Sequence, residues 1–195
     1  MRDEQYRPDD IGAYGAREQP AIVARMTPHL RLTQVGNLLA LVAVILTVAA
    51  QLTYPQSFAS VTGRAAMVTA LVSSVLLLLI CSFQHFAWLR AMAEWKGQRD
   101  VDLVPLRRIS WILHLVSYLV LIVGLWGCVA ASGAAGWSAT ASVLLAFALL
   151  SMIAAQICAG VQYLRTSGPP GTVPTHMRAL LRRANPRAPR PGDED

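Results

Sequence analysis

The sequence predicts an all-α integral membrane protein, a four-helix transmembrane bundle with both termini in the cytoplasm. The first observation is composition, because 54% of the 195 residues are hydrophobic and only 14% are charged, against about 25% in soluble domains. The second is a set of four apolar runs, each longer than the roughly 20 residues that a helix needs to cross a ~30 Å hydrocarbon core. The runs contain no Asp, Glu, Lys or Arg and cover residues 32–54, 65–89, 109–131 and 137–164.

The basic residues predict the orientation. Of the 17 Lys and Arg residues, five precede the first run, five lie between the second and third, six follow the fourth, and Arg64 alone lies on the other side. Basic residues collect in cytoplasmic loops, so both termini and the middle loop are expected in the cytoplasm. The single Lys and the abundant Ala, Gly and Pro suggest a bacterial genome rich in G and C, and hence the inner (plasma) membrane.

Residues 1–30 are expected to form a mobile cytoplasmic tail. They show no helical period of apolar residues and contain Pro8, Pro20 and Pro28, which are typical of irregular segments. The first apolar run begins after this tail and is too long for the core of a signal peptide, so it is expected to remain as the first span of a bundle over residues 31–165.

The next segments have recognisable helix ends. Residues 91–94 are good helix formers, so the second helix is expected to continue to about Trp95. Asp102 is a candidate cap for the third helix, with Pro105 in its first turn. Only the stretch SGAAGW joins the third and fourth runs, so these two spans are expected to form an antiparallel hairpin.

Residues 166–195 are predicted to be a cytoplasmic linker and a basic C-terminal tail. The stretch TSGPPGTVP is rich in helix breakers, and the following THMRALLRRA could form a short amphipathic helix on the membrane surface. Arg178, Arg182 and Arg183 would then contact anionic lipid. A disordered basic tail is the alternative.

Small and weakly polar residues recur along each run at alternating steps of three and four, which predicts that these stripes face the bundle interior. Counted from the nearest basic residue at ~1.5 Å per residue, Asn37, His85 and His114 lie roughly 8–9 Å below the cytoplasmic boundary. The predicted polar layer consists of Gln34, Asn37, Gln84, His85, His114, Ser117 and Gln156. Trp and Tyr residues near the span ends, such as Trp88 and Tyr163, are interpreted as membrane-interface anchors.

Three functions are compatible with such a layer. Buried polar groups need partners, so the layer first predicts hydrogen bonds that fix helix register in a non-enzymatic accessory or scaffolding subunit of a larger membrane complex, or in a small homo-oligomer. The first alternative is an electron carrier that binds haem b through His85 and His114. The second is a small-solute or lipid transporter or flippase, although the spans contain no acidic residue.

Other classes lack their motifs. No nucleophile elbow, Walker loop, dinucleotide fingerprint, HExxH or CxxC occurs, so neither an enzyme nor a metal site is expected. Cys81, Cys128 and Cys158 all fall inside the runs and are predicted to be packing residues. The expected partners are membrane lipids and other integral membrane subunits or further copies of the chain. The net charge of +6 follows from topology and does not predict nucleic-acid binding.

Overall fold

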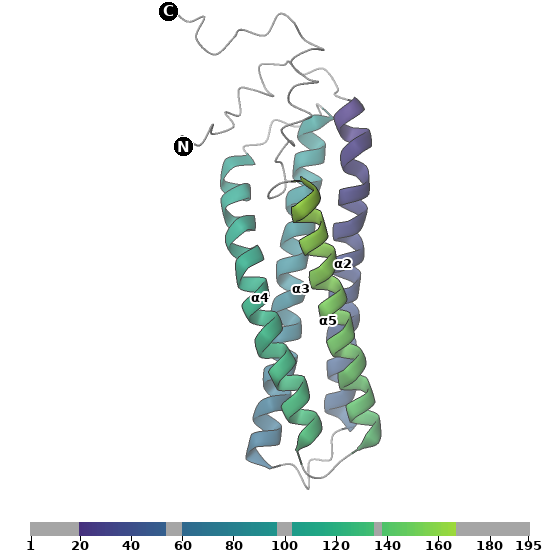
Figure 1. The fold of residues 1–195 in the computed structure, drawn as a ribbon, viewed down its shortest axis with the longest axis vertical. Coiled ribbons are helices and arrows are strands. Elements are labelled where there is room, and N and C mark those ends of the chain that lie inside the picture. The colour runs from purple at the N-terminus through teal and green to yellow at the C-terminus, as the bar shows by residue number, and fades with distance from the viewer. Residues whose placement is uncertain (1–19, 54–59, 97–102, 135–137, 167–195) are drawn as a thin grey trace, which may run out of the picture.

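The computed structural model describes residues 20–53, 60–96, 103–134 and 138–166. These residues form four helices, labelled as in Figure 1: α2 (Pro20–Thr53), α3 (Val61–Trp95), α4 (Leu103–Gly133) and α5 (Ala139–Thr166). Each is long and apolar enough to cross a membrane, which confirms the predicted all-α class with four candidate spans. The predicted surface segment with Arg178, Arg182 and Arg183 lies outside the described residues.

Helix α2 begins earlier than predicted. Residues 20–30 were assigned to a mobile tail, but they are helical, with Pro20 at the first position. A proline there loses no helical hydrogen bond, and Pro28 is accommodated on an exposed face inside the helix. Beside it, the Thr27 hydroxyl donates to the Val23 carbonyl at 2.7 Å. The tail prediction was wrong for this segment, because a helix can continue through a single proline when neighbouring groups satisfy the freed backbone groups.

The other helix ends follow the local sequence. Helix α3 ends at Trp95, and Pro105 lies in the first turn of α4, as predicted. Two serines cap helix starts: the Gly63 amide donates to Ser60 Oγ at 3.0 Å, and the Ala141 amide donates to Ser138 Oγ at 3.3 Å. Such caps satisfy amides that have no partner inside the helix.

The four helices lie side by side along one long axis (Figure 1). Helix α2 packs extensively against α5 and α3, and α3 packs extensively against α4, whereas α4 and α5 contact each other much less. Successive helices run in opposite directions, so α2 and α4 begin at the end where α3 and α5 finish. We call this the basic end, because Arg31, Arg90, Arg108 and Arg165 lie close to it.

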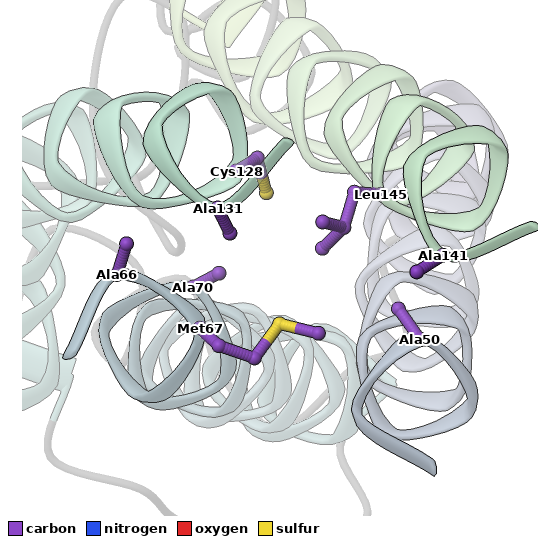
Figure 2. Packing of buried hydrophobic residues seen from close by; sticks show 8 residues of the cluster. All are labelled: Ala50, Ala66, Met67, Ala70, Cys128, Ala131, Ala141 and Leu145. Atoms are coloured by element: carbon purple, nitrogen blue, oxygen red, sulfur yellow. The ribbon is translucent and has the colours of Figure 1, made fainter. Parts of the chain in front are cut away.

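Away from the basic end the interior is apolar. Figure 2 shows the cluster nearest the opposite end, whose side chains come from all four helices and fill the space between them: Ala50, Ala66, Met67, Ala70, Cys128, Ala131, Ala141 and Leu145. A second buried cluster follows it along the bundle: Ala40, Ala43, Leu77, Ile80, Cys81, Val120, Met152 and Ala155. Most members are small, which lets neighbouring helices approach closely without lipid between them.

Glycine brings α3 and α4 into backbone contact. A Cβ atom added to Gly127 would lie 2.7 Å from the Ala70 nitrogen and 3.0 Å from the Ala66 carbonyl oxygen. On the other side of the bundle, a Cβ atom on Gly36 of α2 would lie 3.3 Å from the Cβ atom of Cys158 on α5. These are the close approaches that stripes of small residues allow.

Candidate functional site

The structure places the seven residues of the predicted polar layer at three levels of exposure. Four are buried: Gln84, His114, Ser117 and Gln156. Two are half-buried: Asn37 and His85. The remaining residue, Gln34, is exposed. The predicted layer therefore divides into buried, half-buried and exposed residues.

Gln34 does not belong to the interior layer that was predicted. Thr33 and Asn37, one helical turn apart, occupy the inward face of α2. The next residue along an α-helix is turned by about 100°, which directs Gln34 outward. Equal depth is therefore insufficient to place a residue in the layer, because the side chain must also lie on the inward face of its helix.

Three pairs of polar side chains join α2 to α3, at 2.8 Å for Asn37–Ser82, 3.0 Å for Thr33–His85 and 3.1 Å for Thr47–Ser74. The Thr33 hydroxyl also lies 2.8 Å from the Leu30 carbonyl oxygen. A hydroxyl has one hydrogen to donate, so Thr33 donates to Leu30 and accepts from the Nδ1–H group of His85. The contacts of His85 are thus those of a residue that ties two helices together.

A second polar seam joins α4 to α5. The Tyr163 hydroxyl donates to the Ser110 carbonyl oxygen at 2.8 Å, and Gln156 Nε2 donates to Ser117 Oγ at 2.9 Å. The Ser117 hydroxyl in turn donates to the His114 carbonyl oxygen at 2.6 Å. The three α4 residues are spaced by four and three positions, so they share one face of that helix.

Three aromatic rings surround the imidazole of His114. The Tyr163 ring lies parallel to it, with centroids 3.7 Å apart and an angle of 6°. Tyr118 meets it edge-on at 5.0 Å, with its hydroxyl oxygen 3.4 Å from His114 Nε2. Trp111 is tilted at 6.4 Å. This packing holds the histidine ring in one orientation against α5.

The basic half of the bundle also contains buried polar atoms without a hydrogen-bond partner among the described residues, including Gln84 Nε2, Ser110 Oγ, His114 Nδ1, Gln156 Oε1 and Gln162 Oε1. An unpaired polar atom costs free energy in an apolar environment. Three of these atoms, those of Ser110, His114 and Gln156, belong to the seam between α4 and α5.

Sequence reasoning misplaced two aromatic residues and missed Ser110. Trp88 and Tyr163 were interpreted as lipid-facing anchors, but Trp88 is fully buried and Tyr163 is 7% exposed. The sequence did contain a signal, because Ser110 lies four residues before His114 and Tyr163 lies seven after Gln156. Extending the predicted stripe of α4 by one turn toward the basic end would have included Ser110, whereas Tyr163 lies outside the stripe predicted for α5.

The two histidines predicted as alternative haem ligands have different neighbours. Two axial imidazoles would have to point at a common iron. His85 Nδ1 contacts Thr33 of α2, and the His114 ring lies flat against Tyr163 of α5. Within the described residues, no three His, Cys, Asp or Glu side chains gather in a group that could hold a metal ion.

Comparison of the chain with models of protein families, with curated proteins and with solved structures found no match.

Proposed function

We propose that the protein is a non-enzymatic subunit that packs against other integral membrane subunits, or against a second copy of itself, as a scaffold in the membrane. The supporting observation is the outer face of α4. Trp111, Tyr118 and Trp126 are each more than 40% exposed on this helix. The three residues are spaced by seven and eight positions, which keeps them on one side of the helix.

Helix α2 offers a contrast. The large exposed hydrophobic residues of α2 are all aliphatic: Val35, Leu38, Leu41, Val42, Ile45, Val48 and Leu52. Aliphatic side chains suit contact with lipid tails, whereas Trp and Tyr are enriched where proteins meet. Tyr118 lies ten residues from Arg108, which is ~15 Å along the helix and near the middle of the hydrocarbon core. Tyrosine anchors normally lie at the headgroup level, so this position favours a protein neighbour.

The interior supports the same proposal. The polar pairs between α2 and α3 and between α4 and α5 fix the register of the helices, and the glycine contacts hold the backbones together. A bundle with a fixed shape presents a constant surface to a partner. We further propose that the basic end faces the cytoplasm of a bacterial cell and contacts anionic lipid there, in agreement with the distribution of Arg and Lys.

The experiment compares full-length variants extracted from native membranes in a mild detergent and analysed by native mass spectrometry. Trp126→Ala removes an aromatic side chain from the α4 face, and Leu38→Ala, on an equally exposed position of α2, is the matched control. We expect a stoichiometric complex, with a second subunit or a second copy, that Trp126→Ala weakens and Leu38→Ala leaves unchanged. A chain that is extracted as a monomer, or equal effects of both substitutions, would contradict the proposal.

Haem binding and transport stay predictions with their own tests. A haem-b protein purified from haem-replete cells has a Soret band that shifts when dithionite reduces it, and His85→Ala or His114→Ala would abolish the band. A transporter would lose activity in Asn37→Leu or Gln156→Leu while remaining folded. Neither outcome is required by the scaffold proposal.

A further inference from the structure

Polar side chains reach the outer edge of the contact between α2 and α3, in the half of the bundle near the basic end. The Ser82 hydroxyl donates to Asn37 Oδ1 at 2.8 Å, and His85 Nδ1 lies 3.0 Å from the Thr33 hydroxyl oxygen. Asn37, Ser82 and His85 are only half-buried, so they lie at the border of the contact and not at its centre. We call this border, defined by these three residues, the α2–α3 edge.

Two amide groups at this edge have hydrogen-bond donors to spare. Ser82 uses the oxygen of the Asn37 amide, whereas the Nδ2 group of Asn37 has no partner among the described residues and is not enclosed by them. Gln34 lies three positions before Asn37, and among the Asn and Gln residues of the four described helices it alone is exposed. A polar group that faces lipid without a hydrogen bond costs free energy, so these amides favour a neighbour with acceptor oxygens.

Two arginines lie closer to the basic end on the same two helices. The guanidinium carbon of Arg90 lies 4.9 Å from the centroid of the Phe86 ring, which is 44% exposed, so this charge is held on the outer surface of α3. Arg31 is exposed on α2. Because His85 lies opposite Thr33 and the two helices run in opposite directions, Arg31 lies within one helical turn of the level of Arg90. The two positive charges therefore share one level.

The depths of these groups match those of a phospholipid. Gln34 and Asn37 lie three and six residues after Arg31, which is ~4.5 Å and ~9 Å farther into the membrane. Lipid phosphates lie in the polar head-group region, and the ester oxygens lie inside them, at the border of the hydrocarbon core. The arginines favour a negatively charged head group. A soluble anion would stay at the level of the arginines and leave both amides without acceptors, so the occupant that fits is a lipid.

We propose that the α2–α3 edge binds one anionic phospholipid. Its phosphate lies between Arg31 and Arg90, and its ester carbonyl oxygens accept hydrogen bonds from the amides of Gln34 and Asn37. This inference deepens the proposed contact of the basic end with anionic lipid and rests on it, because it assigns that contact to one position. It is independent of the scaffold role, since no residue of the partner face on α4 takes part.

The test titrates the full-length protein in a mild detergent with phosphatidylglycerol or, for comparison, phosphatidylcholine, and native mass spectrometry counts the bound lipids. One variant combines Arg31→Gln with Arg90→Gln. The matched control combines Arg108→Gln with Arg165→Gln, which removes the same charge from exposed positions near the same end of α4 and α5. We expect the first phosphatidylglycerol to bind about tenfold more tightly than phosphatidylcholine. The first variant should lose this preference, and the control should retain it.

The other outcomes separate this site from the wider lipid contact. Equal binding of the two lipids to the unchanged protein would overturn both the site and the proposed contact of the basic end with anionic lipid. A preference for phosphatidylglycerol that falls equally in the two charge variants would overturn the site alone. Helical circular dichroism and elution as a single species check that each variant is folded, as is expected for substitutions at exposed or half-buried positions.

A further substitution tests the level of the ester oxygens without changing the charge. Gln34→Leu removes an exposed amide, and Thr69→Val, at an exposed position of α3 far from the basic end, is its control. We expect Gln34→Leu to weaken the binding of the first phosphatidylglycerol about threefold, as for the loss of one hydrogen bond, and Thr69→Val to leave it unchanged. Undiminished binding to a folded Gln34→Leu protein would show that the lipid does not use this amide, and the proposal would be wrong.

Discussion

Helix α4 has two neighbours that hold it by different means. Against α3 it packs extensively, and Gly127 lets the two backbones touch near Ala66 and Ala70. Against α5 it packs much less, and the contacts are side-chain hydrogen bonds and the stacked rings of His114 and Tyr163. One seam depends on the shape of two backbones, and the other depends on a few side chains that substitution can remove singly.

This difference shows that a short loop does not dictate close packing. The α4–α5 connection is short, and the sequence predicted a hairpin there, yet α4 packs more extensively against α3. Inside a membrane the hydrophobic effect does not drive helices together, and association depends on packing and polar contacts. The α3–α4 pair, with glycine and alanine at its interface, therefore packs extensively, whereas the α4–α5 pair, with bulky aromatic and polar residues, packs much less.

The largest expected effect is at the backbone contact. Gly127→Leu forces α3 and α4 apart, because the nearest atoms are backbone atoms of Ala66 and Ala70 that cannot rotate away. We expect the free energy of unfolding to fall by more than about 3 kcal/mol. The measurement is the thermal midpoint of unfolding in detergent, which should be lower than in the unchanged protein. Gly160→Leu, at the other seam of the bundle, should cost far less. If Gly160→Leu lowered the stability more than Gly127→Leu, the proposed difference between the two seams would be wrong.

The next effect concerns the ring at the α4–α5 seam. Tyr163→Ala removes the ring that stacks on His114 and should cost about 2 kcal/mol. Tyr163→Phe keeps the ring and loses only the hydrogen bond to Ser110, which is worth about 0.6 kcal/mol in a membrane. The same thermal measurement distinguishes them. If both variants lose the same stability, the hydroxyl and not the ring holds this seam.

A smaller effect is expected between α2 and α3, where the pairs are hydrogen bonds without ring stacking. In a double-mutant cycle of Asn37→Ala and Ser82→Ala, we expect a coupling free energy of about 0.6 kcal/mol. Free energies of unfolding of the two single variants and the double variant provide the measurement. Strictly additive losses would show that the 2.8 Å contact between these side chains does not stabilise the helix pair.

The smallest effect is expected at Gln34, which the structure turns outward. Gln34→Leu should change the free energy of unfolding by less than about 0.5 kcal/mol, as is usual for exposed positions. A thermal midpoint lowered as much as in Tyr163→Ala would mean that Gln34 faces a neighbour, and would restore it to the interior layer.

Much of the site followed from sequence. His114 and Ser117 were predicted to face inward, and both are buried. Gln84 and Gln156 were assigned to the layer by their depth, and they are buried too. The helical period decides which residues share a face, so small and polar residues in register indicate the inner side. The period could not place Gln34, which shares the depth of the layer but not its face. It also could not distinguish Trp88 and Tyr163 from lipid-facing anchors, because an aromatic residue near a span end is compatible with either position.

The sequence by itself determined that there are four long helices and where three of them have their ends, because an apolar run longer than the hydrocarbon core has one stable conformation in lipid. It also determined the stripes of small residues. Only the tertiary structure decided which helices pair closely, that His85 contacts α2 while His114 contacts α5, and that Tyr163 stacks on the His114 ring. These features depend on the rotation and partner of each helix, which result from the fit of all four surfaces together and from no single segment.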